Sequence, residues 1–224
     1  MNNVFQNIDN QIKEQITEFY YQKGFVAQPD YTGFFVKKDN YRQKVLIGPT
    51  GEYSSRIIYE PSFNIFYFEI QTIKGKVFGE ESRFRNFTIK ASQGEKLAQS
   101  YGVKDYEGWT MYDVKGEADI ELMVEHHKGF MKKVGWKFLE QVQTIEGINN
   151  YLNTPVVSID ADNLSQEEKT RFVRHNGADW MVNGLVAAWL VKDKNFQQLV
   201  DNYRAIYFPE HIQQTLDTLI KNLT

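Results

Sequence analysis

The aromatic residues of this 224-residue chain are concentrated in its first half, and no other feature of the sequence constrains the fold as strongly. Of the 33 phenylalanine, tyrosine and tryptophan residues, 22 lie within residues 1–112. Aromatic and β-branched side chains favour the pleated, half-buried surfaces of β-sheets. We therefore expect the sheet in the first half of the chain.

Five segments of the first half have the composition of strands. They are residues 31–38, 41–48, 52–60, 63–74 and 84–90. Asp39-Asn40 is a favoured pair for a two-residue hairpin turn. Pro49-Thr50-Gly51 and Pro61-Ser62 predict the next two turns. Successive strands joined by short turns indicate an antiparallel meander.

One helix is expected before the sheet and several after it. Ile8, Ile12 and Ile16 recur every four residues, as on one face of a helix, and Gly24 suits its C-terminal cap. A break near Gly135 and a helix end before Pro155 are expected, because both residue types disfavour helix interiors. Later helical patterns cover 93–101, 117–142, 145–152, 165–177 and 179–191, followed by two helices that begin near Asn195 and Pro209. Ser165 and Glu168 have the spacing of a capping box at the start of the helix at 165–177.

The order of these elements predicts an α+β fold, with an N-terminal helix, an antiparallel sheet of about five strands and a mainly helical C-terminal half. The best boundary lies in residues 153–163. Residues 1–152 would then form an α+β sheet domain, and residues 153–224 a helical subdomain packed on it. A single domain of residues 1–224 is the alternative.

Composition excludes several classes of protein. The chain has no cysteine, which removes disulfides, thiolate catalysis and zinc ribbons together. A net charge of −3 argues against a nucleic-acid partner. The sequence contains no run of about 18 apolar residues, so we expect no membrane-spanning helix. Residues Met1 to Asn10 lack the basic start of a signal peptide. We expect a globular cytoplasmic protein with no membrane partner.

Sequence signatures of catalysis are missing as well. GxGxxG, GxxxxGK[ST], GxSxG and HExxH do not occur, and Gly48-Pro49-Thr50-Gly51 is interpreted as a turn. The sequence therefore predicts no catalytic residue, no cofactor-binding residue, no metal ligand and no cofactor, and it favours a protein that is not an enzyme. Because many sites are assembled from distant residues, an enzyme stays open.

Two groups of residues resemble metal sites but have simpler explanations. His127 falls on the apolar stripe of its helix, so we interpret it as a core histidine with one hydrogen bond, and His126 as a solvated neighbour. Asp160-Ala161-Asp162-Asn163 begins like a calcium loop, but Leu164 and Ser165 break the pattern, which leaves a polar loop before a helix.

Three further groups are assigned to ordinary surfaces and cores. Glu117, Glu121 and Glu125 share one helical face, which we interpret as solvated. Arg83 and Arg85 alternate with aromatic residues, as in any half-exposed strand. The tryptophans are assigned to core packing, although they and the aromatic sheet could also line a ligand pocket. These tryptophans are Trp109, Trp136, Trp180 and Trp189.

The order of elements resembles a known group of proteins. A helix ends in Gln22-Lys23-Gly24-Phe25, a strand follows at residues 33–38, and a paired strand at 43–47. After the sheet come Gly135-Trp136-Lys137-Phe138-Leu139 and a short helix at 145–152. This pattern, over roughly residues 10–152, resembles the small bacterial α+β domains of unknown function that recur among polymorphic-toxin immunity proteins.

The resemblance implies a non-catalytic protein-binding module that neutralises a toxin enzyme by covering it. It supplies no catalytic residues and leaves residues 165–224 unexplained. Residues 113–224 carry 16 acidic and 12 basic groups, so we expect an acidic patch there for a basic toxin partner. The alternative is a small-molecule-binding protein or enzyme with its site in the concavity of the aromatic sheet. The sequence leaves the partner's identity, any ligand and the oligomeric state open.

Overall fold

The computed structural model describes most of the chain and confirms the α+β fold. The described residues are 3–28, 33–53, 56–81, 87–91, 94–103, 112–114, 117–207 and 209–224. Contacts divide the chain into two compact units. The first unit comprises residues 1–65 and 90–140, and the second comprises 66–89 and 141–224. The boundary expected at residues 152 and 153 lies inside a helix of the second unit.

The sheet follows the chain in simple order. Its strands are β1 (Val26–Ala27), β2 (Gly33–Lys37), β3 (Tyr41–Tyr53), β4 (Arg56–Tyr67), β5 (Ile89–Ala91) and β6 (Tyr112–Val114). Strands β1 to β5 neighbour one another in sequence order, and β6 pairs with β4. The predicted Asp39-Asn40 turn is confirmed, because the Lys38 N–H donates to the Tyr41 carbonyl at 2.9 Å between β2 and β3.

Two predicted turns are wrong. Pro49-Thr50-Gly51 lies within β3, and Pro61-Ser62 lies within β4, so the predicted third strand at 52–60 is split between the two strands. The side chain of Pro61 is buried. Residues 54 and 55, which connect β3 and β4, lie outside the described residues. Proline and glycine can also occur within strands, for example at sheet edges and bulges, so their presence alone does not specify a turn.

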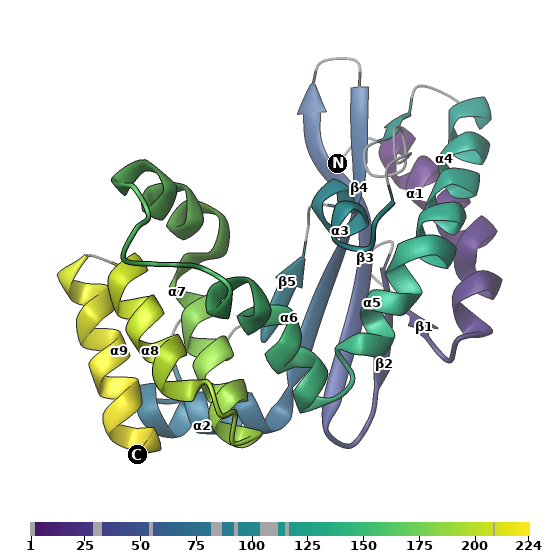
Figure 1. The fold of residues 1–224 in the computed structure, drawn as a ribbon. Helices are drawn as coiled ribbons and strands as arrows, with labels where there is room; N and C mark the ends of the chain where they lie inside the picture. The colour runs from purple at the N-terminus through teal and green to yellow at the C-terminus, as the bar shows by residue number, and fades with distance from the viewer. Residues whose placement is uncertain are drawn as a thin grey trace. The chain divides into compact units, whose positions relative to one another are not determined.

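The core of the first unit lies between one face of the sheet and a helical layer (Figure 1). Helices α1 (Asn3–Tyr21) and α4 (Glu117–Phe130) lie side by side. The ring of Tyr20 on α1 stacks on Phe34 of β2, with centroids 4.1 Å apart. Phe63 of β4 meets Phe130 at 6.2 Å. The predicted apolar stripe of the first helix is confirmed at Ile12 and Ile16, since both are fully buried.

The helix that follows α4 changes its winding rather than breaking. A π-helical turn, η2 (Met131–Gly135), leads directly into α5 (Trp136–Gln141). The N–H of Trp136 donates to the carbonyl of Met131, five residues earlier, which is the π pattern. The break predicted near Gly135 is therefore a widened turn within one continuous helix.

The most informative correction concerns residues 68–74, which were predicted to extend a strand. Helix α2 (Phe68–Phe78) begins directly where β4 ends. The Thr88 hydroxyl oxygen accepts hydrogen bonds from the Tyr67 N–H and from Gln71 Nε2, both at 2.9 Å, and so fixes the transition. On α2, Ile70, Gln71 and Lys74 are buried, which is helical spacing.

The second unit is a layer of helices around a buried helix. Besides α2 it contains α6 (Ile145–Val157), α7 (Gln166–Leu190), α8 (Phe196–Ile206) and α9 (Glu210–Leu223). The capping box predicted at Ser165 and Glu168 is confirmed at the start of α7. Gly177, predicted to end that helix, instead makes a kink with φ 62°, and its carbonyl accepts the Tyr207 hydroxyl at 2.6 Å.

Helix α6 continues past the point where it was predicted to end. Pro155 lies inside it, and the helix runs to Val157. Its last carbonyls are satisfied from α8, because Asn202 Nδ2 donates to the carbonyl of Val156 at 2.8 Å. Trp180 Nε1 donates to the carbonyl of Leu152 at 2.8 Å. These side-chain contacts hold α6 against its neighbouring helices on both sides of Pro155, which lacks an N–H of its own.

Two short elements complete the comparison. Helix α3 (Gly94–Ser100) and the following Gly102, with φ 72°, match the helix predicted at 93–101. Of the predicted strand at 84–90, residues 84–86 lie outside the described residues, and β5 starts only at Ile89.

Candidate functional site

The segment of α7 just before the candidate site is buried and hydrogen-bonded to neighbouring helices. Residues 181–188 are all buried, so this helix is surrounded on every side. Asn153 of α6 donates to the carbonyl of Gly184 at 2.7 Å and accepts the hydroxyl of Tyr203 at 3.0 Å. A Cβ built on Gly184 would lie 2.5 Å from Asn153 Oδ1. The three helices therefore approach closely through a polar network that fixes the course of α7.

The next residue, Trp189, departs from the sequence prediction. It was assigned to core packing, but 40% of its surface is exposed. Trp136 at 9% and Trp180, which is half-buried, fit that assignment better. Trp109 lies outside the described residues. Tryptophan is enriched among the residues that contribute most to protein interfaces, so its exposure here marks a candidate contact.

The end of α7 has an unusual residue at a strained position. The N–H of Lys192 donates to the Trp189 carbonyl at 3.1 Å, and the N–H of Asp193 donates to the Ala188 carbonyl at 2.9 Å. This pair of bonds is a Schellman motif, in which the residue at the position of Lys192 takes a left-handed conformation. Lys192 has φ 54°, and among the described residues it is the one non-glycine residue with positive φ.

Two other helices of the chain show what this position normally contains. At the end of α1, Gly24 N donates to the Tyr21 carbonyl and Phe25 N to the Tyr20 carbonyl, at 2.9 and 3.1 Å. The same pair of bonds follows α3, with Gly102 in the left-handed position. A lysine there costs roughly 1–2 kcal/mol relative to a residue without Cβ strain. Strain of this kind clusters at functional sites.

Asp193 anchors the connection from α7 to α8. Its carboxylate accepts Asn149 Nδ2 at 2.6 Å and the backbone N–H of Asn195 at 2.8 Å. Its carbonyl accepts the N–H of Phe196 at 3.0 Å. The loop that carries Lys192 is thus fixed at both ends, and the ring of Phe196 is positioned near Trp189.

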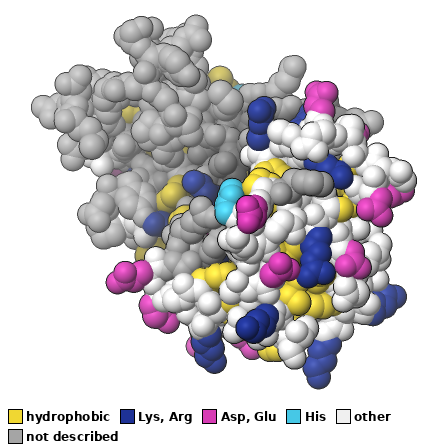
Figure 2. Space-filling view, turned by 90° about the vertical axis from the view of Figure 1, so that its left-hand side faces the viewer, with side chains coloured by type: hydrophobic (Ala, Val, Ile, Leu, Met, Phe, Trp, Pro, Cys, Tyr) yellow, Lys and Arg dark blue, Asp and Glu magenta, His cyan; other side chains and the backbone are white. Residues whose placement is uncertain are grey.

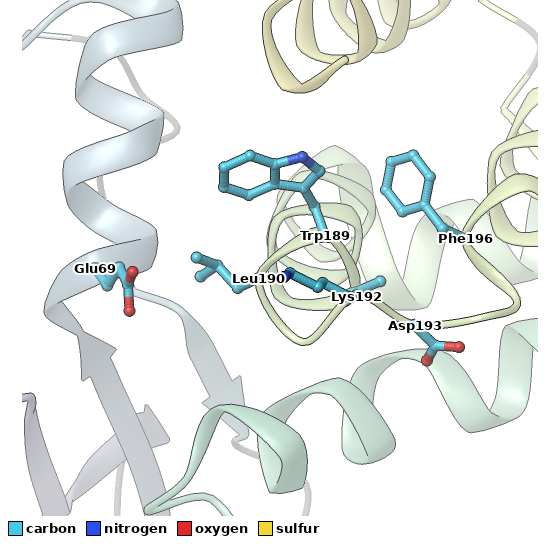
Figure 3. Close-up of a pocket in the computed structure, with 7 residues that line it drawn as sticks. Glu69, Trp189, Leu190, Lys192, Asp193 and Phe196 are labelled. Atoms are coloured by element: carbon cyan, nitrogen blue, oxygen red, sulfur yellow. The ribbon is translucent and has the colours of Figure 1, made fainter.

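These residues line an open cleft of about 540 Å³, which we call the Trp189 cleft (Figure 3). Figure 3 shows the rings of Trp189 and Phe196 projecting in the same direction from α7 and α8, with Glu69 on α2 at one side. The lining residues are Glu69, Ala188, Trp189, Leu190, Lys192, Asp193 and Phe196. They combine two aromatic rings with two carboxylates and one ammonium group, so the cleft can contact both apolar and charged groups of a ligand or partner.

His127 confirms its prediction as a core histidine. It is fully buried, and its Nε2 shares a hydrogen bond of 2.8 Å with the Tyr20 hydroxyl. Burial, with a smaller contribution from the charge of Lys128, lowers the pKa of His127 to about 3. The imidazole is therefore neutral at physiological pH. His126 beside it is half-buried.

None of the other predicted groups that the structure describes is among the residues that line the Trp189 cleft. Asn163 Nδ2 donates to Asp160 Oδ2 at 2.6 Å within the loop before α7. Glu121 and Glu125 are exposed on α4, as expected for a solvated face. The side chain of Glu117, the pair Arg83 and Arg85, and the side chains of Gly48 to Gly51 lie outside the described residues. In the described part of the chain, no three histidine or acidic side chains are grouped so that they could hold a metal ion.

The surface charges and the helix-covered face of the sheet bear on the predicted acidic patch and on the predicted ligand site in the sheet. On the face drawn in Figure 2, described acidic and basic side chains are interspersed, with hydrophobic side chains between them. The helix-covered face of the sheet is filled by side chains, because Phe34, Val45, Ile47 and Phe63 are buried there. Gln43 on this face donates to the Leu139 carbonyl at 2.6 Å.

Comparison with models of known protein families, with curated proteins and with solved structures finds no match for this chain. Among the described residues, no helix combines the length and apolar character needed to cross a membrane. The functional argument therefore depends on the Trp189 cleft itself. Sequence reasoning missed this cleft, because the apolar composition of the segment that ends at Trp189 indicated burial of the whole helix.

Proposed function

We propose that the chain is a non-catalytic protein-binding module of the bacterial cytoplasm, which binds a basic partner protein as a toxin-neutralising immunity protein does. The observation that carries this proposal is the exposure of Trp189 beside Phe196 on a rigid, strained helix end. Tryptophan is among the residues that contribute most to protein interfaces. A rigid surface binds with a smaller entropy loss than a mobile one.

The charge of the cleft supports the choice of partner. Glu69 and Asp193 contribute two carboxylates to the lining, against the single ammonium group of Lys192. The second half of the chain also carries more acidic than basic groups. A basic partner would be attracted by the carboxylates and would bury the apolar rings at the centre of the contact.

The test uses the protein encoded by the gene adjacent to this one in the native genome. Its inhibition of growth is measured with and without coexpression of this chain, and its binding is measured by calorimetry. We expect growth to be rescued and a complex to form. A neighbouring protein that neither inhibits growth nor binds would contradict the proposal.

Two cleft variants and one control variant locate the contact. Trp189→Ala and Phe196→Ala should each weaken binding by about 30-fold or more, as hot-spot truncations do. Leu122→Ala removes another exposed apolar side chain, 56% exposed on α4 in the first unit, and should change the Kd less than about twofold. Thermal unfolding of all three variants checks that they remain folded. Equal losses in all three would argue against the Trp189 cleft as the contact.

A further inference from the structure

A second cleft, in the first unit, is lined by lysines and has no part in the proposed protein-binding function. It has a volume of about 520 Å³. We call it the lysine cleft, because Lys23, Lys132 and Lys137 line it together with Trp136. The remaining lining residues are Phe19, Gln22 and Glu140.

The floor of the lysine cleft is rigid. The ring of Trp136 packs against Tyr20, Phe19 and Phe25 with centroid distances of 5.3, 5.5 and 5.6 Å. Lys23 Nζ lies 5.7 Å from the centroid of the Trp136 ring, within the range of a cation–π interaction. The Schellman motif at Gly24 fixes the backbone beside Lys23. One of the three ammonium groups is therefore held in place by the fold.

The π-helical turn explains how the other two lysines come to share the cleft. Lys132 and Lys137 are five residues apart, and in a regular α-helix they would point about 140° away from each other. The turn η2 takes in an extra residue, which brings residues five apart toward the same face. A Cβ on Gly135 would meet Met131 Sδ within this turn, so glycine permits the winding. Such turns are frequent at functional sites.

The charges of the cleft define what it could bind. Lining it are three ammonium groups and one carboxylate, that of Glu140, which leaves an excess of two positive charges. In the described part of the chain no ion pair joins these lysines to a carboxylate. Lysine acts as a point charge toward phosphate, whereas planar carboxylate recognition favours arginine, which this lining lacks. The volume falls within the range of small-molecule sites.

We infer that the lysine cleft binds a small polyphosphate ligand, such as a nucleoside triphosphate, through Lys23, Lys132 and Lys137. The ligand must carry at least two negative charges to balance the cleft. Its phosphates would contact the ammonium groups above the Trp136 ring. This binding is separate from the Trp189 cleft, so either assignment can fail without the other.

The experiment measures binding to the full chain by calorimetry, in low salt and without magnesium. The probes are ATP, inorganic tripolyphosphate and adenosine. ATP and tripolyphosphate should bind and adenosine should not, because the phosphates carry the interaction. Tighter binding of ATP than of tripolyphosphate would identify a nucleotide, and equal binding would identify the phosphate chain as the whole ligand. Both results support a polyphosphate site.

Variants separate a site from diffuse attraction. Lys132→Gln with Lys137→Gln should weaken ATP and tripolyphosphate binding at least about tenfold. Lys194→Gln with Lys221→Gln removes two exposed lysines of the second unit and should change the affinity less than about twofold. Equal losses in the two double variants, adenosine binding as tight as that of ATP, or no binding of either phosphate compound would each overturn the assignment. Thermal unfolding confirms that both double variants are folded.

Discussion

The buried His127 predicts a specific sensitivity of this fold to acid. Its imidazole is fully buried between α4 and α1, and Tyr20 provides its hydrogen bond at Nε2. Among the described residues Nδ1 has no hydrogen-bond partner. Protonation of this ring would place a charge in an apolar interior, where the Nδ1–H of the imidazolium has no acceptor, so the folded protein disfavours it.

The magnitude follows from the two pKa values of His127. Its pKa is about 3 in the folded protein, against 6.5 in the unfolded chain. Between these values the unfolded chain binds a proton that the folded protein does not, so stability falls as the pH falls through this window. Above 6.5 the contribution is constant. At about pH 4.5 the loss from this single group is about 3 kcal/mol relative to neutral pH.

Urea unfolding at a series of pH values from about 7.5 to 4.5 measures this loss. The wild-type chain is compared with His127→Gln, which keeps a polar partner for Tyr20 but has no group that titrates in this range. Carboxylates contribute to acid unfolding in both chains, so the difference between the two curves isolates His127. We expect the free energy of unfolding of the variant to decline less, by about 3 kcal/mol over this range.

Two further chains make the result decisive. His211→Gln removes an exposed imidazole and should follow the wild-type curve. The double variant Tyr20→Phe with His127→Leu removes both polar groups and should also lose the extra acid sensitivity. If wild type and both His127 variants lose stability in parallel from neutral pH to about pH 4.5, the reasoning about the buried imidazole is refuted.

Glycine positions give two further tests, each measured by urea unfolding. Gly184→Ala should destabilise the protein by about 2–3 kcal/mol, because its Cβ would lie 2.5 Å from Asn153 Oδ1. Gly129→Ala should stabilise the protein by about 1 kcal/mol, because the space around Gly129 is open and alanine favours a helix. Lys192→Gly should stabilise by about 0.5–1 kcal/mol by relieving the left-handed strain, and Gly24→Ala should cost a similar amount. The opposite sign in either pair would contradict the corresponding argument.

The features that sequence predicted well depend on a few neighbouring residues. The Asp39-Asn40 turn, the capping box of Ser165 and Glu168 and the cap at Gly24 are each determined by local hydrogen bonds. The stripe of the first helix, including Ile12, also needs only the 3.6-residue period. His127 was interpreted correctly because its place on an apolar stripe already implied burial.

The errors arose where distant residues decide the local structure. Residues 68–74 alternate like a strand, but the hydroxyl of Thr88 ends the strand at Tyr67 and begins a helix. Pro155 continues a helix because side chains from α7 and α8 bind the carbonyls around it. No pattern within a short window contains these partners. Residues 66–89 likewise belong by their contacts to the second unit, although most of that unit follows them much later in the sequence.

Neither cleft could be predicted from the sequence. The exposure of Trp189 depends on where α7 leaves the surrounding helices, and the apolar composition of its segment suggested burial instead. The left-handed conformation of Lys192 has no sequence signal, because lysine is rare there. Lys132 and Lys137 are assigned to different faces by the α-helical period, and only the π-helical turn brings them together.

The exceptions to local rules in this chain are of two kinds, and the difference between them supports the two candidate sites. Lys74 is an unusual residue for a core position, but Asn183 Oδ1 accepts its ammonium group at 2.8 Å inside the second unit. Pro155 is likewise explained by contacts that stabilise the fold. Lys192 and the turn η2 instead place charged side chains in open clefts, where a ligand or partner can reach them. An irregularity that stability does not explain is best explained by binding.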